Sequence, residues 1–151
     1  MPTITSTVTV RAPVEVVYEL AKQIERLPEF DESLQSVRVA ERDGSRTISE
    51  WVGLIPEFRR TIKWTEEDLW DDEARVCRFA QTEGDFHEYR GTWSFAGQAD
   101  GTTRVDLELQ YEFSVPLIGP LIKNLLRQKT QQAADATLGA IKQLAESQAG
   151  T

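Results

Sequence analysis

From residue 35 to residue 113 the chain alternates apolar and polar positions with a period of two, the pattern of strands with one buried face. The clearest case is "TRVDLELQYEFSV", residues 103–115. There, charged or amide side chains fill one face and apolar side chains the other: Val105, Leu107, Leu109, Tyr111 and Phe113. Short turns such as Asp43-Gly44 divide the region. The pattern predicts six strands, each antiparallel to the next because the connections are short.

The N-terminal segment predicts one more strand and two short helices. Residues 3–10, "TITSTVTV", alternate β-branched and small polar side chains, which indicates a strand. The following "APVEVVYELAKQIERLPEF" carries apolar residues at helical spacing. Pro13 suits a first helical turn and Pro28 interrupts the continuation, so the second helix is expected to end near Phe30.

The C-terminal part predicts one long helix over residues 120–145, ahead of a polar tail from about residue 146. Lys123, Arg127 and Lys129 lie in its first half. A basic, apolar helix end suits transient contact with an anionic membrane surface, and simple solvent-facing charges are the alternative. Apolar positions recur along the helix at spacings of three and four or their sums: Leu121, Ile122, Leu125, Ala133, Ala136, Ala140, Ile141 and Leu144.

These elements together predict an α+β chain with the helix-grip fold. A curved, seven-stranded antiparallel sheet wraps around the long C-terminal helix, and two short helices follow the first strand. We expect residues 1–151 to form a single ligand-binding domain, large enough for one core with room for a cavity. An empty apolar void of ~300 Å³ would cost on the order of 7 kcal/mol, comparable to the stability of a domain, so it would hold water or ligand.

Composition narrows the range of partners. The chain has 17 basic and 25 acidic residues, and its formal net charge of −8 argues against nucleic acid. A single cysteine, Cys77, excludes an internal disulfide, and the one histidine, His87, is too few for the usual zinc patterns. We therefore expect no metal and no cofactor. The start of the chain lacks the features of a signal peptide, and no apolar run is long enough to span a membrane, so we expect a cytoplasmic protein.

Several stretches carry a resemblance to a known superfamily: "VRAPVEVVYELAKQIERLPEF", "RTIKW", "EGDFHEYRGTWSF" and "YEFSVPLIGPLIKNLL". The chain resembles the START and birch-pollen-allergen-like (SRPBCC) proteins, in particular the bacterial polyketide cyclase and coenzyme-Q-binding branch. The resemblance implies an internal cavity that holds a hydrophobic lipid, quinone or polyketide. Aromatase/cyclases of this branch carry an arginine followed by aromatic residues on an inner strand. Arg60, Ile62 and Trp64 sit in a similar place here, with Ile62 replacing the first aromatic residue.

Candidate ligand-binding residues are the large side chains that the alternation turns inward. An arginine inside an apolar shell needs a partner, so Arg60 is interpreted as facing a ligand oxygen, an adjacent-strand side chain or water. A position at the rim is the alternative. Tyr89 is the second group expected to orient a ligand oxygen. The full predicted set is Trp51, Arg60, Trp64, Phe79, Tyr89, Trp93 and Tyr111 from the sheet and Leu125 from the helix.

Two other groups of residues receive structural interpretations. The acidic run "EEDLWDDE", residues 66–73, lacks a calcium-loop pattern and is interpreted as a solvated strand edge and turn. Cys77 and His87 lack a third group that would orient a catalytic base. We expect Cys77 to be a small buried hydrophobe and His87 an exposed turn residue.

Three functions remain open from the sequence. The leading interpretation is binding of a hydrophobic small molecule between sheet and C-terminal helix. The alternative is an aromatase/cyclase or dehydratase acting on a polyketide-like substrate, with Arg60 stabilising an enolate and Tyr89 or Tyr111 as the acid. The third is a chaperone that delivers a quinone or lipid, or an interaction module, without turnover.

Overall fold

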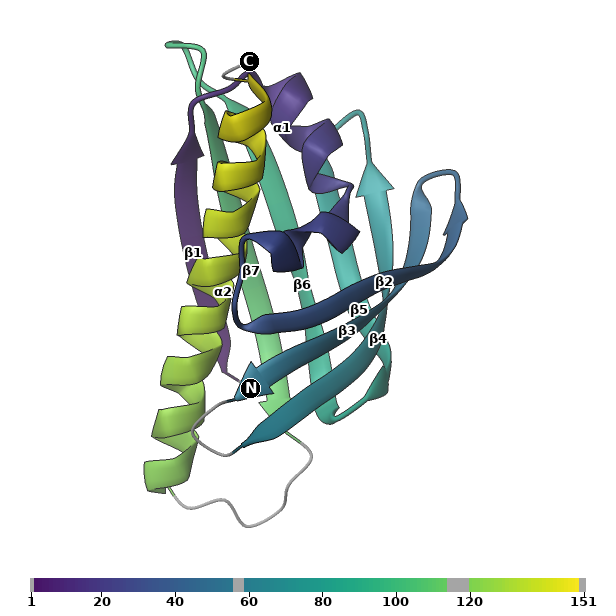
Figure 1. The fold of residues 1–151 in the computed structure, drawn as a ribbon, viewed down its shortest axis with the longest axis vertical. Helices are drawn as coiled ribbons and strands as arrows, with labels where there is room; N and C mark the ends of the chain where they lie inside the picture. The colour runs from purple at the N-terminus through teal and green to yellow at the C-terminus, as the bar shows by residue number, and fades with distance from the viewer. Residues whose placement is uncertain (1, 56–58, 114–119, 150–151) are drawn as a thin grey trace.

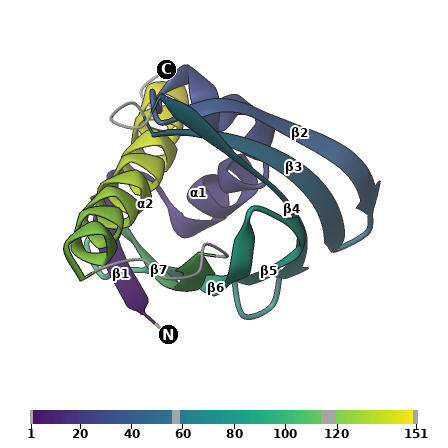
Figure 2. The same ribbon diagram turned by 90° about the horizontal axis from the view of Figure 1, so that it is seen from below.

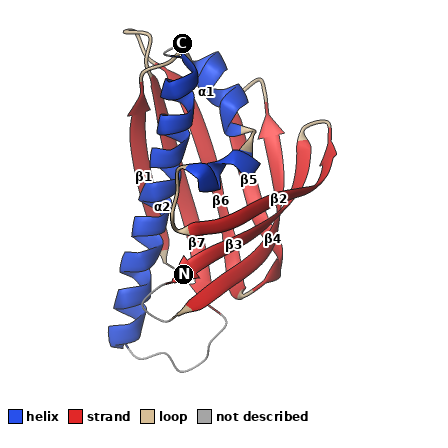
Figure 3. Ribbon diagram, viewed as in Figure 1, coloured by secondary structure: helices blue, strands red, loops and turns tan. Residues whose placement is uncertain are grey.

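A computed structural model describes residues 2–55, 59–113 and 120–149 of the chain. The predicted strands and helices are all present (Figures 1 and 3). In chain order they are β1 (Thr3–Val10), α1 (Val14–Ala21), the 3-10 helix η1 (Ile24–Glu29), β2 (Leu34–Asp43), β3 (Arg46–Ile55), β4 (Arg60–Asp71), β5 (Val76–Gly84), β6 (Phe86–Gly97), β7 (Thr103–Phe113) and α2 (Pro120–Ala149).

The strands form one seven-stranded antiparallel sheet in the order β1-β7-β6-β5-β4-β3-β2. The meander therefore runs from β2 to β7, and β1 pairs with β7 at the far edge. Register shifts interrupt the pairing of β2 with β3, β4 with β5 and β6 with β7, and such irregularities bend a sheet. Figure 2 shows the resulting arc with α2 across its open side, which confirms the predicted helix-grip fold.

Helix α2 packs mainly on one edge of the sheet and on the short helices. Its principal neighbours are β1, α1 and η1, whereas it has few contacts with β7. In its C-terminal half every third or fourth side chain is buried, which is the helical periodicity that a single packed face requires. These residues are Leu138, Ala140, Ile141, Leu144 and Ala145. The first half of α2 instead faces the concave side of the sheet across an open space.

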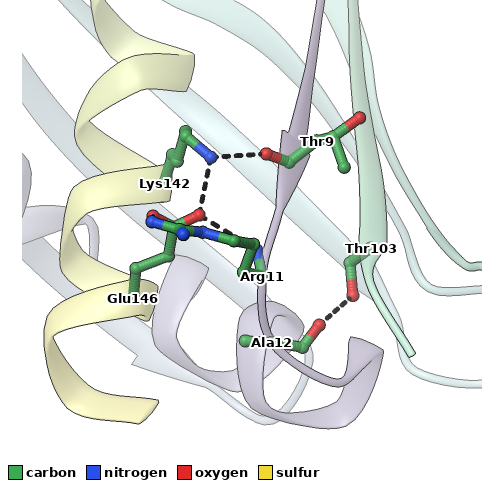
Figure 4. Close-up of polar contacts among 6 residues, drawn as sticks. All are labelled: Thr9, Arg11, Ala12, Thr103, Lys142 and Glu146. Atoms are coloured by element: carbon green, nitrogen blue, oxygen red, sulfur yellow. Dashed lines mark hydrogen bonds and ion pairs between the residues drawn. The ribbon is translucent and has the colours of Figure 1, made fainter. Parts of the chain in front are cut away.

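A polar cluster fixes the C-terminal end of α2 to the end of β1 (Figure 4). Glu146 accepts hydrogen bonds from the backbone N–H of Arg11 at 3.0 Å and from the Arg11 guanidinium at 3.2 Å. Lys142 donates to Glu146 at 2.6 Å and to the Thr9 carbonyl at 2.7 Å. The bonds from Lys142 and then Arg11 lower the pKa of Glu146 to about 2. The helix continues to Ala149, beyond the predicted end at residue 145, and Glu146 lies within it.

Two buried polar side chains hold the segment between β1 and β2. Thr103 is fully buried and donates a hydrogen bond of 2.7 Å to the Ala12 carbonyl, where the chain turns from β1 towards α1. Asp31, 2% exposed, accepts hydrogen bonds from the Ser33 backbone N–H at 2.9 Å and from the Thr137 hydroxyl at 3.1 Å. The second contact ties the loop after η1 to α2.

Candidate ligand-binding cavity

A cavity of about 430 Å³ lies between the concave face of the sheet and the first half of α2. The alternation of the strands turns aromatic and aliphatic side chains into it. From the sheet these include Trp51, Ile62, Trp64, Phe79, Phe86, Tyr89, Trp93, Leu107, Leu109 and Phe113. From the helix they include Leu126, Thr130, Ala133, Ala134, Ala136 and Thr137. The small side chains of α2 leave the space that the large side chains of the sheet surround.

The exposed residues among those that line the cavity lie on α2, on β3 and in the η1–β2 loop, and we call this side the mouth. Glu32 and Leu54 line it from the η1–β2 loop and β3, and both are exposed, with Leu54 at 38%. Gln132 of α2 lines the same side and is exposed as well. Trp93 and Leu107, in contrast, line the cavity and are buried. The mouth is therefore bordered by polar and aliphatic residues, and the closed end is aromatic and aliphatic.

Ring contacts join the aromatic wall into one surface. Trp51 and Trp64 are paired across β3 and β4, and their rings stack with centroids 5.7 Å apart and planes 10° from parallel. Tyr89 lies between Trp64 and Phe79, with ring centroids 5.0 Å and 5.7 Å away. Trp93 then meets the Phe79 ring edge-on at 6.4 Å. Such a wall offers flat apolar faces to a ligand with a planar body.

Gly91 of β6 allows this wall to close. A Cβ atom at Gly91 would lie 2.2 Å from the Glu108 carbonyl oxygen and 2.7 Å from the Phe79 ring. Both approaches are shorter than any ordinary contact, so only glycine fits. The Phe79 ring consequently lies directly against the backbone of the neighbouring strand.

Two carboxyl groups are buried on the inner face of β4. Glu66 is 4% exposed and lines the cavity, and Asp68, 3% exposed, is two residues further along the same face. Each of the two side chains affects the pKa of the other. The Trp64 indole donates to Glu66 Oε1 at 2.8 Å, and the Ser49 hydroxyl donates to Asp68 Oδ2 at 2.7 Å. We refer to Glu66 and Asp68 as the carboxyl pair.

The environment of the carboxyl pair favours retention of a proton. Burial raises the pKa of Glu66 well above its ordinary value, and the charge of Asp68 raises it further. Burial also raises the pKa of Asp68, while hydrogen bonds from Glu66 and Ser49 oppose that rise. Two adjacent buried carboxylates repel each other strongly, so ionisation of one opposes ionisation of the other. A group of this kind can donate or accept a proton or a hydrogen bond.

Tyr89 brings a second polar group to the same wall. Burial raises the pKa of its phenol, and the nearby charges of Glu66 and Asp68 add to the effect, so the hydroxyl stays neutral. Within the described residues no hydrogen bond joins this hydroxyl to another side chain or to the backbone. The cavity thus contains a neutral phenol beside the carboxyl pair.

The structure brings most of the predicted binding residues together, but not all of them. Trp51, Trp64, Phe79, Tyr89 and Trp93 line the cavity, and their ligand contacts remain predictions. The other three predicted residues lie outside it.

Leu125 and Tyr111 do not line the cavity, although residues next to them do. Leu125 is half-buried and does not line the cavity, whereas the next residue, Leu126, is buried and does. Tyr111 is 3% exposed and packs with its ring 5.5 Å from that of Phe113, which does line the cavity. Tyr111 belongs to the buried core around the cavity, whereas Leu125 does not.

The interpretation of Arg60 as a cavity residue is wrong. Arg60 is the first residue of β4 and is exposed, and it does not line the cavity. On β4 it precedes Ile62 and Trp64, which line the cavity, and it is paired with Ile55 of β3, which lines the cavity as well. The alternative position at the rim, where water can solvate the guanidinium, is the one observed.

The interpretation of residues 66–73 as a solvated edge is wrong for Glu66 and Asp68. Alternation along β4 puts Trp64, Glu66, Asp68 and Trp70 on the buried face. The outward residues between them behave as expected for a solvated edge, since Leu69 is 45% exposed. The alternation that predicts buried tryptophans on β4 also predicts that Glu66 and Asp68 are buried. This alternation was therefore the feature of the sequence that indicated the carboxyl pair.

Cys77 and His87 are not neighbours in a catalytic site. Cys77 is buried, and burial raises the pKa of its thiol, which keeps it protonated and unreactive. His87 is exposed on β6. Among the described residues no group of three or more His, Cys, Asp or Glu side chains is arranged to hold a metal ion, and no helix combines the length and hydropathy that crossing a membrane requires.

Comparison with known proteins identifies the family. Residues 10–137 match the sequence profile of the family described as "Polyketide cyclase / dehydrase and lipid transport". The chain belongs to this family. The matched residues include most of the cavity wall. The predicted polyketide cyclase family is thereby confirmed, and solved structures of START-like proteins share its fold.

Two solved structures of this fold are closely superimposable. TTHA0849 from Thermus thermophilus is 35% identical, with a TM-score of 0.91 over 97% of this chain and 98% of that one. The Zhui aromatase/cyclase from Streptomyces sp. R1128 is 18% identical, with a TM-score of 0.86 over 96% of this chain and 93% of that one. At that identity the second comparison shows the fold alone.

A curated relative carries an activity in its name. The granaticin polyketide synthase bifunctional cyclase/dehydratase of Streptomyces violaceoruber is 29% identical over 143 residues, which are 93% of this chain. The chain spans 43% of the length of that relative. The family description includes both lipid transport and cyclase or dehydrase activity, which is consistent with the predicted binding of a hydrophobic small molecule and with the alternative.

Proposed function

We propose that this protein binds a hydrophobic, partly oxygenated small molecule in the cavity between the sheet and α2. The observation that carries the proposal is the cavity itself, about 430 Å³ and within the range of small-molecule sites, about 300–1,000 Å³. At ~24 cal/mol per Å³, an empty apolar void of this size would cost about 10 kcal/mol, comparable to the stability of a domain. Water or a ligand therefore fills it, and an apolar wall favours the ligand.

Specific roles follow from the wall. Trp51, Trp64, Phe79 and Trp93 would provide flat apolar faces for the body of the ligand. Tyr89 would orient a ligand oxygen through its neutral hydroxyl. A quinone, a lipid or a polyketide fits this description, and binding of coenzyme Q stays a prediction.

Native mass spectrometry of the purified protein, without added ligand, tests the proposal most directly. A co-purified quinone, lipid or aromatic compound is expected. The neutral fluorescent probe N-phenyl-1-naphthylamine provides a second measurement. Ala133→Phe fills part of the cavity from α2 and should weaken binding of this probe at least about tenfold, because the added ring takes the space of the ligand.

Gln143→Phe is the matched control, since Gln143 is exposed further along the same helix. It should leave the affinity for the probe unchanged. An unchanged affinity in a folded Ala133→Phe protein would contradict the proposal, as would an equal loss in both variants.

The second candidate function is cyclisation or dehydration of a polyketide-like substrate. The family description and the name of the granaticin relative favour it, and the cavity wall offers ionisable groups for it. With Arg60 exposed at the rim, Glu66 would take the role of proton acceptor and Tyr89 that of acid. Absorbance of a poly-β-ketone thioester incubated with the wild type and with Tyr89→Phe tests turnover. Binding of the thioester without an absorbance change would favour a carrier.

Transient membrane contact is a further part of the proposal. Lys123 and Arg127 are exposed on the first half of α2, and Lys129 lines the mouth of the cavity. Sedimentation with phosphatidylglycerol vesicles should carry down the wild type and less of a Lys123→Gln, Arg127→Gln protein. The expected cytoplasmic location remains a prediction that cell fractionation tests.

A further inference from the structure

The carboxyl pair sits where it can contact a ligand. Glu66 lines the cavity with 4% of its surface exposed, and Asp68 lies behind it on the same face of β4. Trp64, which lines the cavity and donates to Glu66, holds the carboxyl group against the aromatic wall. A ligand that reaches the stacked Trp51 and Trp64 therefore also meets Glu66.

Within the described part of the chain, no hydrogen bond or ion pair joins the carboxyl pair to a basic side chain. Its hydrogen bonds come from the Trp64 indole and the Ser49 hydroxyl, which are neutral donors. Ser49 in turn accepts a bond of 2.8 Å from the Trp51 indole. A negative charge that forms when one carboxyl group of the pair ionises is therefore stabilised by neutral hydrogen-bond donors.

From this geometry we propose that the carboxyl pair selects ligands by charge, admitting a neutral hydroxyl at the aromatic wall and disfavouring a carboxylate there. The inference rests on the proposed binding function and names the ligand class of the same cavity. A carboxyl oxygen has two lone pairs, so Glu66 Oε1 can accept a second hydrogen bond beside that of Trp64. A phenol or enol on a planar body supplies that donor.

A carboxylate in the same place faces two costs. It has no proton to donate to Glu66, and its charge is repelled by the pair in a medium of low dielectric constant. At a separation of a few ångströms such repulsion amounts to at least about a tenfold loss of affinity. The pair would therefore distinguish a phenol from an acid with the same apolar body.

Three naphthalene probes test this prediction with the wild-type protein. 2-Naphthol, 2-methoxynaphthalene and 2-naphthoate share one ring system and differ in a single group, and calorimetric titration at pH 7 gives each affinity. 2-Naphthol should bind most tightly, the methyl ether several-fold more weakly because it has no O–H, and 2-naphthoate at least about tenfold more weakly than 2-naphthol.

A variant in which neither residue of the carboxyl pair can ionise then tests whether the pair causes the selectivity. Glu66→Gln combined with Asp68→Asn keeps the shape and the hydrogen-bonding groups but removes the charge, so 2-naphthoate should gain at least about tenfold. Glu83→Gln combined with Glu112→Gln removes two exposed acidic groups from the outside of the sheet and should leave the ratio of affinities unchanged.

The outcomes separate the two proposals. Equal binding of 2-naphthol and 2-naphthoate by the wild type overturns the charge selection and leaves the binding function standing. If the double variant folds and still binds 2-naphthol more tightly than 2-naphthoate by the wild-type ratio, the charge selection is also overturned and the binding function stands. If the double variant does not fold, the order of the three probes with the wild type still decides. Failure of all three probes to bind overturns both proposals.

Discussion

The two halves of α2 belong to one helix but meet different surroundings. In the C-terminal half Leu138, Ile141 and Leu144 are at most 1% exposed, and Glu146 closes the contact with Arg11. In the first half Leu126 and Ala133 face the cavity instead of a filled core. The helix is therefore anchored at one end and works as a wall at the other.

Because of this difference, we expect the C-terminal half of α2 mainly to determine the stability of the fold, and the first half mainly to determine binding in the cavity. Side chains in the anchored half are surrounded by protein, so their removal leaves a cavity where none existed. Side chains in the first half already border open space, and the volume they occupy determines what fits there. Substitutions in the two halves should therefore affect different measurements.

The largest expected effect comes from truncating matched leucines in the two halves. Leu144→Ala, at a fully buried position, should lower the free energy of unfolding by about 2–5 kcal/mol. Leu126→Ala, on the cavity wall, should cost less than half of that, because its loss only widens existing space. Urea denaturation with unchanged m-values measures both. Equal losses at the two positions would contradict the division of the helix.

A smaller effect is expected at the anchor. Glu146→Gln should lower the stability at pH 7 by about 1–3 kcal/mol, because it weakens the bonds from Lys142 and Arg11 to a charged acceptor. The pKa of Glu146 is lowered to about 2, so its contribution is complete above the unfolded value near 4.5 and is lost as the pH falls towards 2.

The unfolding free energies of the wild type and Glu146→Gln should accordingly converge between pH 4.5 and pH 2. Glu112→Gln, an exposed substitution of the same chemistry, is the matched control. A gap that stays constant down to about pH 2 would mean that the charge of Glu146 is not its source.

The smallest effect is expected at Arg60. Because this side chain is exposed at the start of β4 and lies outside the cavity wall, Arg60→Ala should change the affinity for N-phenyl-1-naphthylamine by less than about twofold. The same titration that detects Ala133→Phe measures it. A loss of affinity as large as that expected for Ala133→Phe would show that Arg60 contributes to binding.

Periodicity in the sequence predicted the sheet and most of the aromatic wall, because a strand with one wet face must alternate. Trp51, Trp64, Phe79 and Trp93 follow from that rule directly. The rule shows which face of a strand a side chain lies on, but it does not show how exposed the position is. For this reason the sequence did not show that Arg60, the first residue of β4, is exposed. On a helix, adjacent residues differ by only about 100°, so Leu125 and Leu126 could not be separated by spacing.

The carboxyl pair was missed for a different reason. A run of acidic residues is usually solvated, and that expectation outweighed the alternation that puts Glu66 and Asp68 inside. A hydrogen-bond donor from another strand stabilises the buried carboxyl groups. Ser49 of β3 is paired with Glu66 of β4, and its hydroxyl donates to Asp68. Partners supplied across a sheet cannot be read from the spacing within one strand.

The arrangement of the indoles gives the protein an internal optical reporter. The chain has four tryptophans, and Trp51, Trp64 and Trp93 border the cavity. The stacked rings of Trp51 and Trp64 are close enough for their electronic transitions to couple. Occupation of the cavity should therefore alter the emission spectrum and the near-ultraviolet circular dichroism of the unlabelled protein.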